Sequence, residues 1–295
     1  MSAIVPAGAP IAVVAPSGDF DEAKLARGLE VARAAGHVLV PFPDLRRPHR
    51  YLAAPDDKRL ADLTYALTAK QFAAVWAVRG GYGLTRLIER LPWSKVRAIP
   101  VIGFSDVTPL LDVVRRTQLR EVVHGPVLHS LAETAPAARA HLFDLLAGRP
   151  TAPLQGETWV EGEAVGPLVG GNLALLAATC GTPIQLDAEG CILALEDVGE
   201  APYRIDRMLQ QLRSAGVLDG VAGFALGRFA GCDPPEGTPW SLADVLREHL
   251  EPLGVPVVAE LPFGHVRDNF ALPLGRTVRL GGGVLDLTPQ PDLHG

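Results

Sequence analysis

Apolar runs alternate with segments of helical periodicity along the first half of the chain. The runs are rich in Val, Ile and Ala, which is typical of buried strands. Strands are predicted at residues 11–15, 38–42, 73–78, 99–104 and 121–123. The segments between them repeat apolar residues every three to four positions, which predicts helices. Helices are predicted at 21–35, 56–69, 84–91 and 109–116, and residues 141–146 belong to another. This alternation predicts a parallel sheet with helices on both faces.

In such a sheet, ligands bind beyond the carboxyl ends of the strands. Three loops leave predicted strand ends: residues 16–19, residues 79–83, and the turn at Ser105 and Asp106. We therefore expect the functional site at these loops.

Residues 148–153 are rich in proline and glycine, which suits a linker between two domains. We place the boundary there, which gives domains at residues 1–150 and 151–295. The second half opens with alternating apolar and polar residues over 158–169. Helices are predicted at 173–179, 203–215 and 242–250, and strands at 192–195 and 221–226, with several short strands after them. The second domain is therefore expected to be mixed α/β with more strand character than the first.

The composition is that of a folded protein with a large core, because 48% of the 295 residues are hydrophobic and 20% are charged. Cys180, Cys191 and Cys232 lack the spacing of a zinc site or a disulfide framework, so we expect reduced packing residues and no bound metal. No signal-peptide pattern and no run of about 18 apolar residues is present. These features predict a soluble, cytoplasmic protein with no membrane partner.

The net charge of −6 is unevenly divided, with an excess of Lys and Arg in residues 1–150 and an excess of Asp and Glu in residues 151–295. The basic residues are scattered over predicted helices and form no stripe with interleaved aromatic residues. We therefore expect no nucleic-acid partner.

Ser105 stands where the predicted strand 99–104 turns directly into a predicted helix. A serine at such a corner is held on a tight turn, with its hydroxyl exposed and the following backbone N–H groups pointing toward the group that it attacks. This is the arrangement of a nucleophile. The alternative is that Ser105 only ends the strand or opens the helix, and an isolated Gly-x-Ser pattern does not distinguish the two.

A serine nucleophile needs a base within hydrogen-bond reach. The chain has only four lysines, none of them in the second half, so histidine is the better candidate. His124 follows a predicted strand and His265 lies in a loop beside a glycine, and the residues alone do not choose between them. Five histidines lie in polar or helical surroundings and are expected at the surface: His37, His49, His141, His249 and His294.

Glu196 and Asp197 end a predicted strand that is otherwise apolar. A carboxylate there needs a partner, because burying an unpaired charge is costly, and an imidazole would serve. The alternative is that either acid caps the next turn or pairs with Arg204 or Arg207.

The glycines of the 79–83 loop expose successive backbone N–H groups at a strand end. Such groups suit an oxyanion or a phosphate, although the same pattern also forms a simple tight turn.

Five blocks of sequence together resemble the LD-carboxypeptidases, serine peptidases of the group that also contains the microcin C immunity hydrolases. The blocks are Val-Arg-Gly-Gly-Tyr-Gly at 78–83, Ile-Gly-Phe-Ser-Asp-Val-Thr at 102–108, Gly-Gly-Asn-Leu at 170–173, Leu-Glu-Asp at 195–197 with Tyr-Arg-Ile-Asp-Arg at 203–207, and Phe-Gly-His at 263–265. They occur in the family's order, and the resemblance spans residues 15–275. Val107 replaces the last glycine of Gly-x-Ser-x-Gly, which disfavours an α/β-hydrolase.

The resemblance implies a catalytic triad in which Ser105 is the nucleophile, His265 the general base and Glu196 the residue that orients the base. It thereby prefers His265 to His124. It also implies an α/β fold with an N-terminal flavodoxin-like or Rossmann-like parallel sheet domain and a C-terminal β-rich swivelling-type domain. The second domain would carry the acid and the base.

The family's oxyanion hole would correspond to the backbone N–H groups of Asp106 and of Gly80 or Gly81. Tyr82, in the same loop, is the candidate substrate-binding residue. The resemblance implies no cofactor and no metal, and it suggests a homodimer.

The function that the resemblance implies is release of the terminal D-alanine from a murein tetrapeptide during peptidoglycan recycling, with the small peptide as the only partner besides a second copy. One alternative is a hydrolase of a peptidyl-nucleotide antibiotic, as in the microcin C immunity relatives. Another is a nucleotide-binding module without catalysis, which the absence of Gly-x-Gly-x-x-Gly after the first strand disfavours.

Overall fold

A computed structural model describes residues 2–118 and 121–291 of the chain. Contacts between Cα atoms divide the chain into two compact units, residues 1–150 and 151–295. No helix among the described residues is both long and apolar enough to cross a membrane.

Unit 1 contains a parallel sheet whose strands pair in the order β5-β4-β3-β1-β2. The strands are β1 (Pro10–Val14), β2 (Val38–Pro41), β3 (Ala74–Ala77), β4 (Val101–Gly103) and β5 (Val122–His124). This is the strand order of flavodoxin-like folds, in which the switch point lies between β1 and β3. All five predicted strands form, each within two residues of its expected ends.

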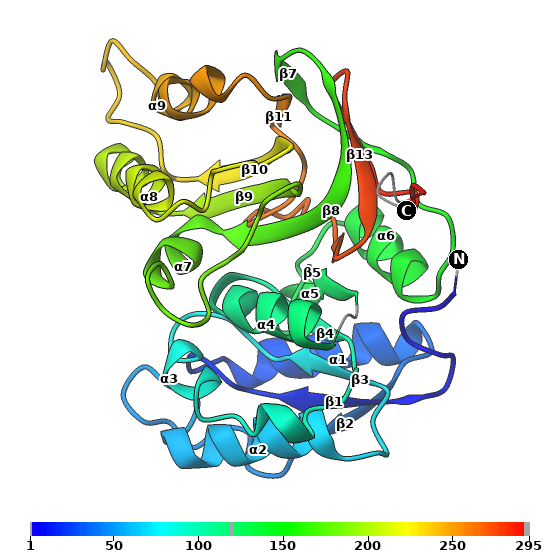
Figure 1. The fold of residues 1–295 in the computed structure, drawn as a ribbon. Coiled ribbons are helices and arrows are strands. Elements are labelled where there is room, and N and C mark those ends of the chain that lie inside the picture. The colour runs from blue at the N-terminus through cyan, green and yellow to red at the C-terminus, as the bar shows by residue number, and fades with distance from the viewer. Residues whose placement is uncertain (1, 119–120, 292–295) are drawn as a thin grey trace. The chain divides into compact units, whose positions relative to one another are not determined.

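Helices cover the two faces of this sheet, as Figure 1 shows for unit 1. They are α1 (Glu22–Ala34), α2 (Asp56–Thr68), α3 (Thr85–Ile88), α4 (Thr108–Gln118), α5 (Leu128–Leu131) and α6 (Pro136–Leu146). Helix α1 packs against α5, whereas α3 packs against both α2 and α4. These groupings agree with right-handed crossovers, which place α1 on one face and α2 to α4 on the other. Helix α5 was not predicted from the sequence, because a helix of one turn is too short to show the repeat of apolar residues that identifies a helix.

Unit 2 contains an eight-stranded mixed sheet in the order β6-β14-β13-β8-β9-β10-β11-β7. Its centre, β8 to β11, is parallel, and antiparallel strands extend both edges. The strands of this unit are β6 (Leu154–Gln155), β7 (Glu157–Val160), β8 (Glu163–Asn172), β9 (Ile192–Val198), β10 (Gly223–Ala230), β11 (Val257–Ala259), β12 (Leu272–Leu274), β13 (Thr277–Gly281) and β14 (Val284–Asp286). The expected run over 158–169 is therefore parts of two strands, β7 and β8, separated by residues 161 and 162.

Three helices, α7 (Leu173–Ala178), α8 (Pro202–Ser214) and α9 (Leu242–Leu250), belong to unit 2. Their apolar faces pack on β8 to β11 in one buried cluster that includes Leu193, Ile205 and Leu246. Local capping fixes where two of them begin. The Asn172 side chain accepts the Leu175 N–H at the start of α7, and Ser241 forms a capping box with Asp244 at the start of α9.

Two of the histidines expected at the surface are buried instead. His141 and His249 are 7% and 9% exposed, and the His249 Nε2 lies 3.0 Å from an Asp206 carboxylate oxygen. Polar neighbours in the sequence suggested exposure, but each histidine lies on the buried face of its helix. His294 is outside the described residues. Cys191 and Cys232 are buried packing residues, as expected, and Cys180 is half-buried.

Candidate functional site

Ser105 is separated from the end of β4 by one residue, Phe104, and opens a short 3-10 turn, Ser105–Val107, that runs into α4. Its φ of 62° lies in the left-handed region, where a residue with a side chain pays about 1 kcal/mol or more in backbone strain. The side chain is half-buried. Strain of this kind persists only where the surroundings hold it, and it is common at functional sites.

Gly80 packs directly against Ser105. A Cβ on Gly80 would lie 2.8 Å from the Ser105 Cβ, 3.0 Å from its Oγ and 3.3 Å from the Asp106 nitrogen. The carbonyl of Gly80 in turn accepts the Gly18 N–H at 3.0 Å. The loops after β1, β3 and β4 therefore meet at the serine, and only glycine fits at position 80.

Asp106 ties the serine turn to the glycine loop. Its buried carboxylate accepts the Leu84 N–H at 2.9 Å. Burial raises the pKa of the Asp106 carboxyl, and hydrogen bonds from Ser17, Leu84 and Gly83 partly offset that rise. The side chain of Asp106 is thus a structural anchor, whereas its backbone N–H lies beside Gly80.

Arg59 is a further anchor that the sequence analysis did not identify. Its guanidinium is almost fully buried and donates to the backbone carbonyls of Pro16, Ala54 and Gly83, and it also pairs with Asp56 at 2.5 Å. One side chain of α2 therefore holds the loops that follow β1 and β3. No signal in the sequence separates Arg59 from the other charged residues of that amphipathic helix.

In unit 2, His265 and Glu196 form a hydrogen-bonded pair. The His265 Nδ1 lies 2.7 Å from the Glu196 Oε2, and the Glu196 side chain is fully buried while that of His265 is 19% exposed. An ionised carboxylate only accepts hydrogen bonds, so Nδ1 carries the proton and Nε2 is left as the basic nitrogen. Gly264, with φ of 112°, allows this approach, because a Cβ there would lie 2.9 Å from the Glu196 Oε2.

Asp197, the neighbour of Glu196 on β9, faces a different set of partners. Its carboxylate accepts from the Asn172 side chain at 3.1 Å and from the N–H groups of Ala174 and Val198, both at 2.8 Å. Burial raises the pKa of Asp197 to about 6, with a further contribution from Glu196. Asp197 therefore holds the start of α7, and the two acids lie within β9 rather than at its end.

The remaining candidates have other surroundings. His124 is fully buried on β5, with its ring 5.9 Å from that of Phe104. Arg204, considered as a partner for Glu196 or Asp197, pairs instead with Glu200 at 3.3 Å. Among the described residues, no three His, Cys, Asp or Glu side chains gather as a metal site would require.

A pocket of about 460 Å³ opens beside the glycine loop of unit 1. The residues that line it come from the loops after β1 and β3 and from the 42–55 segment: Gly18, Tyr51, Arg79, Gly81 and Tyr82. The exposed rings of Tyr51 and Tyr82 lie 5.5 Å apart in an edge-on arrangement. The pocket thus occupies the switch point of the sheet, where flavodoxin-like folds bind their ligands.

The chain belongs to the LD-carboxypeptidase family. Residues 11–125 match the family model of the LD-carboxypeptidase N-terminal domain, and residues 165–280 match that of the C-terminal domain. The family predicted from the five sequence blocks is therefore confirmed.

Individual relatives support this placement along nearly the whole chain. A protein of Synechocystis described as a putative carboxypeptidase is 42% identical over 92% of this chain and 91% of its own length. The murein tetrapeptide carboxypeptidase of Pseudomonas aeruginosa is 36% identical over 93% of this chain and 94% of its own.

Solved structures have the same fold. The crystal structure of muramoyltetrapeptide carboxypeptidase from Oxalobacter formigenes matches with a TM-score of 0.82 at 31% identity, covering 96% of this chain and 99% of that one. An MccF-like protein from Bacillus anthracis matches with a TM-score of 0.86 at 19% identity, covering 98% of this chain and 99% of that one. The second likeness concerns the fold alone, and the predicted fold class is confirmed.

Proposed function

We propose that this protein is a serine carboxypeptidase that hydrolyses the L,D peptide bond of murein tetrapeptide and releases its terminal D-alanine. The observation that carries the proposal is the His265–Glu196 pair, in which a fully buried carboxylate orients an imidazole at 2.7 Å. Membership of the LD-carboxypeptidase family and the 36% identity to the Pseudomonas murein tetrapeptide carboxypeptidase support the substrate.

In the proposed mechanism, the Ser105 hydroxyl attacks the carbonyl carbon of the scissile bond while the Nε2 of His265 takes its proton. The proposal requires these two groups to meet within hydrogen-bond distance, about 3 Å. Glu196 keeps the proton on Nδ1 and stabilises the imidazolium that forms. The imidazolium then protonates the amine of D-alanine, which leaves as the acyl-enzyme forms.

The tetrahedral intermediate carries a negative oxygen, which needs N–H donors already in place. The backbone N–H groups of Asp106 and of Gly80 or Gly81 are our candidates, because Gly80 packs on both Ser105 and Asp106. Water then attacks the acyl-enzyme with His265 again as the base, which releases the tripeptide and restores Ser105. The steps need no cofactor.

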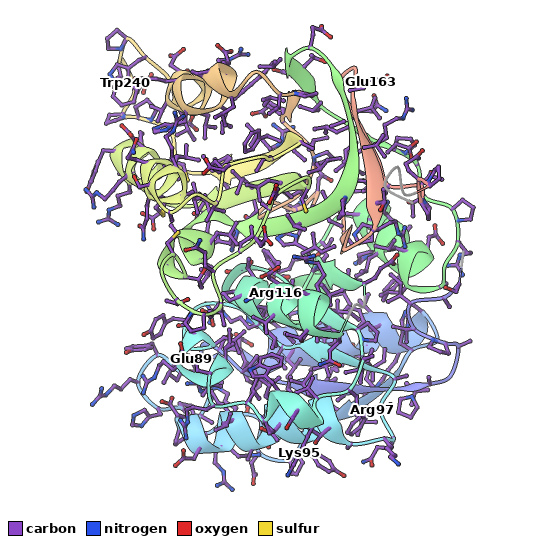
Figure 2. The ribbon with its side chains drawn as sticks, in the orientation of Figure 1. Glu89, Lys95, Arg97, Arg116, Glu163 and Trp240 are labelled. Atoms are coloured by element: carbon purple, nitrogen blue, oxygen red, sulfur yellow. The ribbon has the colours of Figure 1, made fainter. Side chains whose placement is uncertain are left out.

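The alternative substrate, a peptidyl-nucleotide antibiotic, is favoured by the fold likeness to microcin immunity proteins. Such a substrate calls for an aromatic side chain that stacks on a base. Trp76 is fully buried, and Trp159 is covered by the Arg247 guanidinium at 4.3 Å. Trp93 is half-buried and its Nε1 donates to the Ile88 carbonyl at 2.9 Å. Trp240 is exposed, in the loop before α9 (Figure 2), but it does not line the pocket beside the glycine loop.

Mass spectrometry of the purified protein with murein tri-, tetra- and pentapeptides tests the proposal, with Ser105→Ala as the control. We expect release of D-alanine from the tetrapeptide by the wild type and none by the variant. A peptidyl adenylate incubated in parallel tests the alternative. Cleavage of the adenylate without cleavage of the tetrapeptide would refute the proposed substrate.

A further inference from the structure

Arg79 lines the pocket beside the glycine loop and precedes Gly80 in the chain. Its side chain is exposed and donates one hydrogen bond to the backbone carbonyl of Asp19. Among the described residues, no carboxylate lies within ion-pair distance of its guanidinium. The rest of the guanidinium, with donors in a planar fork, is therefore available to an anion.

Neighbouring arginines differ from Arg79 in this respect. Arg46 forms a two-pronged pair with the Asp19 carboxylate at 2.8 and 2.9 Å, and Arg59 and Arg86 both pair with Asp56, at 2.5 and 2.6 Å. Each of these three cations is therefore held in an ion pair within the fold. Arg79 thus supplies a positive charge to the pocket, and a carboxylate is its natural complement.

The position of Arg79 limits which carboxylate it can meet. Gly80 contacts the Ser105 side chain, and the Cα atoms of Arg79 and Gly80 are separated by one peptide unit of about 3.8 Å. When a single residue leaves, its carboxylate carbon lies within roughly 4 Å of the scissile carbonyl carbon. The group that recognises this carboxylate must therefore lie close to the nucleophile. Arg79 is a candidate because its neighbour in the chain, Gly80, contacts Ser105.

We propose that the Arg79 guanidinium binds the terminal carboxylate of the substrate and makes the enzyme specific for the last residue of a peptide. The inference rests on the proposed function and names the group that enforces removal of one C-terminal residue. The Tyr51 and Tyr82 rings flank the pocket and bound the side chain of the leaving residue, which for alanine is a methyl group.

The test compares murein tetrapeptide with its C-terminal amide, which has no terminal charge and is otherwise the same. The wild type should favour the acid in kcat/KM by about 10- to 100-fold, the usual range for a charge-assisted hydrogen bond. In Arg79→Gln this preference should disappear, because hydrolysis of the acid slows while hydrolysis of the amide stays unchanged. Arg79→Lys should keep part of the preference.

Arg90→Gln is the matched control, because it removes the same charge from an exposed pair with Asp57 outside the pocket. It should leave the preference for the acid unchanged. If Arg79→Gln retains the wild-type preference, or slows both substrates equally, the proposal is wrong even though the carboxypeptidase activity stands.

Calorimetry in the Ser105→Ala background gives a second measurement that does not depend on turnover. The tetrapeptide should bind more tightly than its amide, and adding Arg79→Gln should make the two Kd values equal. If Ser105→Ala with Arg79 intact binds the acid and the amide equally, or binds neither, the proposal is overturned. Failure of the proposed function would instead appear as tight, selective binding of the acid with no D-alanine released by the wild type.

Discussion

Replacing Glu196 by glutamine changes one atom in the buried partner of His265 and keeps its shape. The carboxylate that now accepts the Nδ1–H at 2.7 Å becomes an amide that can present an N–H group instead. An amide N–H donating to Nδ1 moves the ring proton to Nε2. The imidazole then has no lone pair to accept the serine proton, and the charge that stabilises the imidazolium is also lost.

The expected loss follows from these two effects. In serine proteases, the corresponding exchange of acid for amide lowers kcat by about 10⁴-fold, chiefly through the wrong tautomer. Glu196 is fully buried, so water does not screen the lost charge. We expect Glu196→Gln to lower kcat by about 10³- to 10⁴-fold, or about 4 to 5.5 kcal/mol in activation free energy, with little change in KM.

The assay is steady-state release of D-alanine from murein tetrapeptide, with circular dichroism melting to verify that the variant is folded. Glu200→Gln is the control, because Glu200 is close in the chain but pairs with Arg204. It should retain wild-type kcat and KM. A Glu196→Gln enzyme within about tenfold of wild-type kcat would refute the role that we assign to the pair.

Two further predictions concern packing and pH. Gly80→Ala should lower kcat by about 100-fold in the same assay, because the new Cβ would lie 2.8 Å from the Ser105 Cβ and displace the nucleophile, and wild-type turnover would contradict this. Burial raises the pKa of Asp197 from 3.8 to about 6, so the folded chain binds this proton more tightly than the unfolded chain. The free energy of unfolding should therefore fall by about 2 kcal/mol as the pH rises from about 4 to 6.5, and urea titrations of Asp197→Asn should lack this part of the slope. An equal pH dependence of the unfolding free energy in the wild type and in Asp197→Asn would contradict the raised pKa of Asp197.

Much of the unit 1 fold was predictable, because each strand is a short apolar run between amphipathic helices. The boundaries of β8 were not, because its first residues alternate and its last are glycines at 170 and 171 that read as a loop. Tertiary pairing with β9 and β13 overrides that local preference.

For the candidate site, residue patterns left the choice of base open between His124 and His265, and the family resemblance favoured His265. The structure brings His265 and Glu196 together across 69 positions of sequence, a contact that no local pattern encodes. Arg59 could not have been predicted, because its burial depends on loops from three separate places in the chain meeting over one face of α2.

The glycines of the 79–83 loop were correctly expected to matter, but exposure of their N–H groups is only part of the reason. The sequence suggested that its glycines expose N–H groups, yet two of them are also required by packing. A side chain at position 80 would collide with Ser105, and one at position 83 would approach Leu52 at 2.6 Å and the buried Arg59 guanidinium at 2.9 Å. The first collision is with the nucleophile itself, and the second includes the arginine that anchors the glycine loop. The geometry of the nucleophile therefore constrains which residue can stand at position 80, and a side chain there should displace Ser105 before it alters any hydrogen bond to substrate.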